Sequence, residues 1–179
     1  MTTYRENFRP YRDIIGLVRQ DVIYADPTLV DPLNPVGVID GEWMTLDSNG
    51  KLIRGVDITL TVGTAASQYT WPVWRELGAY DVQAQAEKKA PIIWLGQWEF
   101  ETRIFDASAT AGTNGLAITT MLQKVKVCSI SLGGYFGTRT LAGLVGHGGS
   151  TDTDPAVGYV TRLPSANSGW LRIKGGVFY

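Results

Sequence analysis

The chain has few of the side chains that most metal sites and nucleophile sites require. Cys128 is its only cysteine and His147 its only histidine among 179 residues. A single cysteine excludes an intrachain disulfide and a cluster of thiolate ligands. A single histidine excludes a zinc site with two histidines and disfavours a catalytic triad. We therefore expect no metal, no cofactor and no enzymatic activity.

Long apolar runs and an excess of one charge are also missing. No stretch reaches the ~18 apolar residues of a membrane span. Residues 1–20 are polar and contain four arginines, unlike a secretory signal. Because the net charge is only −1, the chain has no general attraction for nucleic acid or for an acidic membrane. We therefore expect neither nucleic acid nor a membrane as a partner. We also expect the protein to be made in a reducing, aqueous compartment.

The length of the whole chain corresponds to one domain that carries an arm. The first 35 residues differ in composition from the rest. Residues 1–35 contain four of the eight prolines. An i, i+3, i+4, i+7 spacing of apolar residues predicts a short helix over about 11–20. The segment is either a strap across its own domain or an extended N-terminal arm that docks on a neighbouring subunit. For the second case the predicted contact residues are aromatic and aliphatic: Tyr4, Phe8, Tyr11, Ile14 and Ile15.

From residue 36 to 179 the sequence predicts short strands and turns. Asn49-Gly50 lies between two apolar runs, which is the strongest short-range signal for a hairpin. Residues 80–90 fit either a helical turn or a polar loop. Further strands are expected over 57–62, 69–74 (on an edge or at a bend because of Pro72), 92–95, 97–105, 116–121, 124–130, 156–163 and 171–173. About nine strands with glycine-rich turns indicate an all-β domain, either a β-barrel or a sandwich.

Three groups of residues could bind phosphate, act as catalytic carboxylates or bind calcium, but each has a simpler structural interpretation. Residues 141–150 (LAGLVGHGGS) lack the lysine of a P-loop, so we expect a surface loop in which His147 is solvated. Glu99 and Glu101 could form a pair of catalytic carboxylates, but their alternation with aromatic residues indicates a solvent face. Asp152 and Asp154 precede a proline and fit a turn better than a calcium site.

Two kinds of binding protein remain. Six tryptophans on a β scaffold could include an exposed platform for carbohydrate. Trp43, Trp94 and Trp98 lie in apolar strands and are expected in the core, which leaves Trp71, Trp74 and Trp170 open. Alternatively, a neutral, glycine-rich β domain with an aromatic arm suits a structural subunit, because an arm that orders on binding buries a large surface.

The order of segments resembles virion structural proteins of tailed bacteriophages, most of all head decoration (cement) proteins. The segments that carry this resemblance are 41–47 (GEWMTLD), 49–55 (NGKLIRG), 71–74 (WPVW), 97–102 (QWEFET) with 105–106, 157–161 (VGYVT) and 169–171 (GWL). The resemblance implies a non-enzymatic, β-rich protein, made in the host cytoplasm, that binds the capsid exterior and stabilises the head. Its partner would be the major capsid protein, with self-association. Within the virion the alternatives are a tail or neck subunit and an internal head protein, and outside it the alternative is a carbohydrate-binding module.

Overall fold

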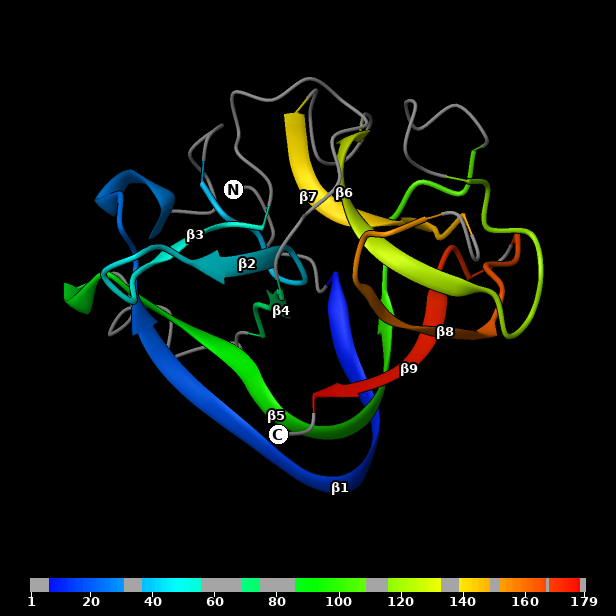
Figure 1. Cartoon of the computed structure of the whole chain (residues 1–179), viewed down its shortest axis with the longest axis horizontal. Coiled ribbons are helices and arrows are strands. Elements are labelled where there is room, and N and C mark those ends of the chain that lie inside the picture. Colours follow the sequence, from blue (N-terminus) through cyan, green and yellow to red (C-terminus); the bar gives the residue numbers. More distant parts are fainter. Residues whose placement is uncertain are drawn as a thin grey trace.

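The computed structural model describes residues 7–30, 37–55, 69–74, 86–108, 116–132, 139–148, 152–166 and 168–177. Its larger sheet has the strand order β1-β5-β9-β8-β6-β7 (Figure 1), with all neighbours antiparallel. The bounds of its strands are β1 (Phe8–Ile23), β5 (Lys89–Thr102), β6 (Lys124–Leu132), β7 (Arg139–Gly146), β8 (Ala156–Arg162) and β9 (Leu171–Val177).

The smaller sheet has the order β3-β2-β4. It consists of β2 (Trp43–Leu46), β3 (Leu52–Arg54) and β4 (Trp71–Pro72), and the 3-10 helix η1 (Pro27–Val30) precedes it in the chain. The prediction of an all-β domain is confirmed. Because β1 and β7 are opposite edges in the strand order, the described part of the larger sheet is open rather than a closed barrel.

The hairpin predicted at Asn49-Gly50 is confirmed. Strands β2 and β3 pair from Met44↔Arg54 to Leu46↔Leu52, and Gly50 has a positive φ of 71°. The Asp47 carboxylate accepts hydrogen bonds from the backbone N–H groups of Asn49 and Lys51, at 2.8 Å each. Strand β4 lies on the edge of this sheet, as its proline predicts.

The short helix expected over 11–20 is wrong, because these residues belong to strand β1. Strand β1 pairs with β5 from Phe8↔Thr102 to Ile23↔Lys89, and the pairing has four register shifts. A bulge inserts an extra residue and resets the two-residue alternation of a strand. The helix-like spacing does not mark one buried face either, because Tyr11 and Val18 are 51% and 45% exposed. Figure 1 shows the two long strands bending together along one side of the molecule.

The core follows the inner face of the larger sheet. Its central cluster contains Trp98 and Phe100 of β5, Leu171 and Ile173 of β9, and Val160 of β8. The smaller sheet packs over one end of β1 and β5, in a second cluster with Met44, Leu52, Trp71, Val22 and Ile92. Residues that alternate with the central cluster on β5, β8 and β9 therefore lie on the outer face.

Two other sequence expectations need correction, and others fall outside the described residues. The strands expected over 92–95 and 97–105 are joined in one strand, β5, which passes through Gly96 with a φ of 113° and ends at Thr102. Residues 116–121 contain only a single bridge, Leu116↔Gly146, instead of a strand. Segment 57–62 lies outside the described residues, as do 80–85; residues 86–88 are a short turn before β5.

The glycine-rich segment 141–150 is also not a loop, since residues up to Gly146 belong to β7. Its glycines serve close packing instead. A Cβ on Gly143 would lie 2.3 Å from Cδ1 of Ile130, and a Cβ on Gly146 would lie 2.3 Å from Nε2 of Gln123. Neighbouring side chains occupy the space that any other residue would need.

Candidate anion-binding face of the larger sheet

A row of charged side chains crosses the outer face of four adjacent strands. The register pairs Arg9 of β1 with Glu101 of β5, Glu101 with Arg172 of β9, and Arg172 with Arg162 of β8. A register shift between Val160 and Arg162 brings Arg162 into this row, since Val160 itself belongs to the core. We call Arg9, Arg162 and Arg172 with Glu101 the arginine row.

A single carboxylate holds all three arginines. Oε2 of Glu101 accepts hydrogen bonds from Nε of Arg9 at 2.7 Å and from its Nη2 at 2.6 Å. Oε1 accepts a hydrogen bond from Nη2 of Arg172 at 2.8 Å, and it forms an ion pair with Nη2 of Arg162, also at 2.8 Å. The glutamate side chain is 3% exposed, whereas the side chains of Arg9 and Arg162 are 43% and 40% exposed. Three cations with one anion leave an excess of positive charge at the surface.

The environment keeps Glu101 ionised. Burial alone would raise its pKa, but hydrogen bonds from Arg172 and Arg9 outweigh burial and hold the pKa below its usual value. Because charge-assisted hydrogen bonds are stronger than neutral ones, the arginine side chains are fixed in position before any partner arrives.

Aromatic rings support the arginines from the side. The guanidinium carbons of Arg9 and Arg103 lie 4.4 Å and 4.5 Å from the ring centroid of Trp170, and that of Arg172 lies 3.4 Å from the ring of Tyr11. Such cation–π contacts add about 0.5–2 kcal/mol each. Since arginines already cover these two rings, the rings are poor platforms for stacking a base or a sugar.

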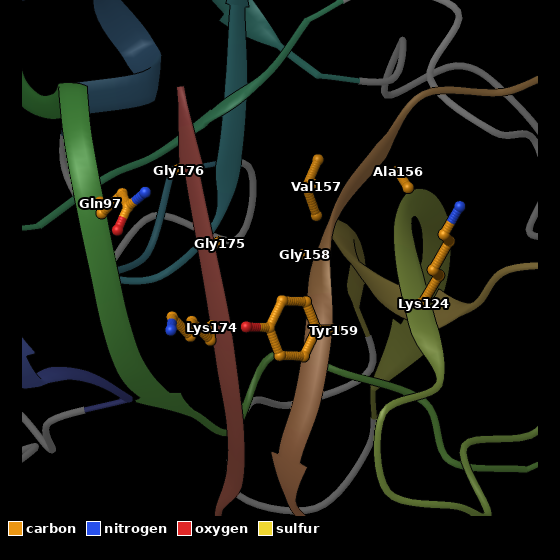
Figure 2. A pocket seen from close by; sticks show the side chains of 9 residues that line it. All are labelled: Gln97, Lys124, Ala156, Val157, Gly158, Tyr159, Lys174, Gly175 and Gly176. Carbon is orange, nitrogen blue, oxygen red and sulfur yellow. The ribbon is translucent and has the colours of Figure 1, made fainter. Parts of the chain in front are cut away.

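A groove lies beside the arginine row, and Figure 2 shows its lining. It encloses about 360 Å³, and its charged and polar side chains are Lys124, Tyr159, Lys174 and Gln97. We call it the lysine groove. The register pairs Lys124 with Tyr159 and Tyr159 with Lys174, so these three side chains form a second row across β6, β8 and β9.

Glu99 belongs to the second row, because the register pairs it with Lys174. The expectation of a solvent face for Glu99 and Glu101 is wrong. Both side chains point away from the core as predicted, yet the two residues are only 4% and 2% exposed. Oγ1 of Thr161 donates a hydrogen bond of 2.7 Å to Oε1 of Glu99. The long side chains of neighbouring strands cover what the alternation pattern indicates as an open surface.

The predicted contact residues of the N-terminal segment fall in different places. Phe8 is fully buried and packs on Phe100 at a centroid distance of 4.4 Å, so it reaches no other molecule while β1 stays in the sheet. Tyr11 is 51% exposed and touches the arginine row. Tyr4 lies outside the described residues, and so do the side chains of Ile14 and Ile15.

Sequence reasoning missed the arginines and lysines of this face. Their only signal is alternation: Arg172 and Lys174 alternate with buried Leu171 and Ile173 along β9. Which cations share a face across strands depends on the register, and a single sequence does not contain the register.

A separate ionic cluster corrects the expectation for His147. The turn contact expected for the two aspartates is present, since Oδ1 of Asp152 accepts a hydrogen bond of 3.2 Å from the backbone N–H of Asp154. Nζ of Lys126, 2% exposed, lies 2.7 Å from both Oδ2 of Asp152 and Oδ2 of Asp154. His147 is 9% exposed rather than solvated, and its Nε2 lies 3.0 Å from the backbone oxygen of Asp154. The two aspartates therefore neutralise a buried lysine.

Other possible chemistry in the described residues is limited. Burial raises the pKa of the Cys128 thiol to about 11, so this side chain is a poor nucleophile at neutral pH. The described residues hold no group of three histidine, cysteine, aspartate or glutamate side chains that could bind a metal ion. Within the same ranges, no helix has the length and apolar character needed to cross a bilayer.

The six tryptophans offer no open platform. Trp43, Trp71, Trp98 and Trp170 are at most 7% exposed, and Trp74 and Trp94 are half-buried. Trp71 and Trp94 stack on each other at 4.6 Å. A carbohydrate site built on an exposed tryptophan therefore has no support in the structure.

Comparison with known proteins gives no further guidance: no family model, curated protein or solved structure matches the chain.

Proposed function

We propose that this protein is a non-enzymatic structural subunit that binds the exterior of a tailed-phage head and stabilises the lattice of its major capsid protein. The place of action rests on the segment pattern of the sequence. The docking surface rests on one observation, the arginine row, in which three arginines share a single buried carboxylate and two of them are 40% exposed or more. Such a row is complementary to an acidic protein surface.

The physical demands of a capsid clamp agree with this surface. A protein present in many copies binds firmly through weak individual contacts, because multivalency multiplies modest affinities. Ion pairs between exposed arginines and acidic groups of a partner contribute little to the free energy of binding. They mainly orient the two proteins and speed their association. Since Glu101 and the two rings fix the arginines beforehand, little side-chain entropy is lost on docking.

The test is co-sedimentation of the purified protein with expanded, undecorated phage heads. We expect saturation at a fixed number of copies per capsid subunit, and weaker binding at high salt because salt screens exposed charges. The double variant Arg9→Gln/Arg162→Gln should bind at least tenfold more weakly. A matched control is Lys51→Gln/Lys88→Gln, which removes the same charge from two exposed residues outside the arginine row.

The outcomes separate the two parts of the proposal. No saturable binding of the wild-type protein at low salt would overturn the head assignment, and the same assay with tails would then test a tail or neck subunit. Saturable binding that the arginine variant and the control reduce equally would keep the assignment but remove the arginine row as the docking surface.

A further inference from the structure

The lysine groove differs from the arginine row in one decisive respect. Glu101 supplies the arginines with an anion from within the chain. Neither Lys124 nor Lys174 has an ion pair or a side-chain hydrogen bond in the described part of the chain. Each ammonium group carries three donors that only water satisfies. The register pairs Glu99 with Lys174, but Glu99 is only 4% exposed, accepts a hydrogen bond from Thr161 and forms no ion pair with Lys174 in the described residues. The groove therefore presents two cations that an anion from another molecule can bind.

The spacing of the two lysines requires more than one anionic group. They occupy β6 and β9, on opposite sides of Tyr159 in β8, so about two strand spacings, ~10 Å, separate their backbones. Figure 2 shows the two ammonium groups pointing away from each other, with the tyrosine ring between them. One carboxylate or one phosphate does not reach both.

The floor of the groove admits a chain at close range. The lining between the lysines and Gln97 includes the backbone of Gly158, Gly175 and Gly176. Gly158 and Gly175 alternate with Tyr159 and Lys174, so a side chain at these two positions would lie on the core face, where a Cβ on Gly175 would come within 2.4 Å of the Trp98 ring. At these positions the groove therefore presents bare backbone. On the same side of an extended peptide, carboxylates two or four residues apart are separated by roughly 7 or 13 Å. Because the two ammonium groups point away from each other, the wider pair of carboxylates fits the lysines better.

We propose that the lysine groove binds two carboxylates of an extended acidic segment of a partner protein. The hydroxyl of Tyr159 and the amide of Gln97 provide neutral donors between and beside the two cations. A protein segment fits better than a nucleic acid, because the net charge of −1 gives no long-range attraction for a polyanion. The biological role of the site rests on the proposed function, since the segment would belong to the capsid partner.

The site can be tested with the full chain and a synthetic peptide. The probe is hexaglutamate, titrated at low salt and followed by ¹H–¹⁵N NMR. We expect saturable shifts at the backbone amides of Gly158, Tyr159, Lys174 and Gly175. All peptides are N-acetylated and C-amidated, so that only glutamate side chains carry charge. Hexaglutamine should cause no shifts, and the peptide QQEQQQ, with one carboxylate, should bind about tenfold more weakly.

Three variants locate the binding. Lys124→Gln and Lys174→Gln should each weaken hexaglutamate about tenfold, the effect of losing one charged hydrogen bond. Lys51→Gln removes the same charge from the exposed hairpin and should change nothing. Unchanged amide spectra away from the groove show that each variant is folded.

Several results would overturn the proposal: no shifts with hexaglutamate, shifts confined to other strands, or equal losses in all three lysine variants. Oligothymidylate binding the same residues more tightly than hexaglutamate would instead identify a nucleic-acid phosphate site. If hexaglutamate binds as expected but the protein does not sediment with heads, the assignment to a phage head is wrong. The conclusion that the lysine groove binds acidic segments is then still supported.

Discussion

Glu42 and Glu101 are both buried glutamates bound to arginine, yet their surroundings differ. The Glu42 side chain is fully buried against Arg54, whose side chain is 3% exposed, with 2.5 Å between Oε1 and Nε. Glu101 is equally buried, but two of its three arginines are 40% exposed or more. The first pair is closed on both sides and the second is open on the cationic side. Closed pairs hold parts of the fold together, whereas open ones leave charge available for binding.

The partners of Glu42 show what the closed pair holds. Its carboxylate accepts hydrogen bonds from the backbone N–H groups of Ile39 and Ala142, at 3.3 Å each. Nη2 of Arg54 donates to the backbone oxygen of Gly37 at 3.2 Å. Since Ala142 lies on β7 and Arg54 on β3, this one carboxylate joins the two sheets.

The largest expected effect is that of Glu42→Gln. Removing one partner leaves the charge of Arg54 buried without its counter-ion, which costs about 3–5 kcal/mol in the free energy of unfolding. Urea unfolding followed by tryptophan fluorescence measures this loss.

The matched control for this substitution is Glu87→Gln. Glu87 and Lys89 form an ion pair with side chains 42% and 35% exposed, and such pairs contribute at most about 1 kcal/mol. A loss in Glu42→Gln no larger than that in the control would contradict the distinction between closed and open pairs.

The hairpin and the alternating strands were predictable because their signals are local. Asn49-Gly50 specifies its own turn, and the two-residue spacing of Glu99 and Glu101 correctly places both on the face opposite Trp98 and Phe100. The burial of both glutamates was not predictable, because the side chains that cover them come from β1, β8 and β9. Contacts between strands distant in the chain depend on register, which the alternation pattern of each strand alone does not determine.

Strand β1 and the glycine-rich β7 show that a local sequence pattern can also indicate the wrong secondary structure. The apolar spacing in 11–20 indicates a helix by itself, and twelve paired positions with β5 override it. Residues 141–146 indicate a loop by themselves, and the side chain of Ile130 on the neighbouring strand explains why Gly143 is a glycine. In both cases tertiary packing decides between local alternatives of similar free energy.

An intermediate effect is expected for Asp152→Asn, since Lys126 is buried but keeps Asp154 as a second partner. Burial alone would raise the pKa of Asp152, but hydrogen bonds from Lys126 and the backbone lower it to about 2. A carboxyl with a depressed pKa stabilises the fold above its unfolded pKa of about 3.9, and the contribution disappears as the pH falls toward 2. We expect a loss of about 1–2 kcal/mol at pH 7.

The pH dependence provides the check on this prediction. Unfolding free energies of wild type and Asp152→Asn, measured from pH 7 to pH 2, should converge at the acidic end. Asp154→Asn should cost less at pH 7, because that side chain is 26% exposed against 9% for Asp152. A difference that persists unchanged at pH 2 would mean that packing, and not the charge of Asp152, stabilises this corner.

The smallest effect on stability is expected for Glu101→Gln, although three arginines lose their anion. Arg9 and Arg162 are 43% and 40% exposed, so water solvates them in the variant, and only Arg172, at 16%, loses its anion in a mostly buried position. We expect a loss of about 1 kcal/mol. The pKa of Glu101 is lowered, so this contribution is present above the unfolded pKa of about 4.3 and disappears on acidification.

The consequence of Glu101→Gln for binding is more informative than its effect on stability. The variant gains one unit of positive charge, so simple Coulomb attraction predicts tighter binding to an acidic surface. If the carboxylate instead keeps Arg9, Arg162 and Arg172 in place, the variant loses their fixed geometry and binds more weakly, because the side chains must then be ordered on docking. We expect severalfold weaker binding in the head co-sedimentation assay, with Lys51→Gln as the unaffected control. Tighter binding would show that the row acts only through its net charge, and the contrast between Glu42 and Glu101 would then concern burial alone.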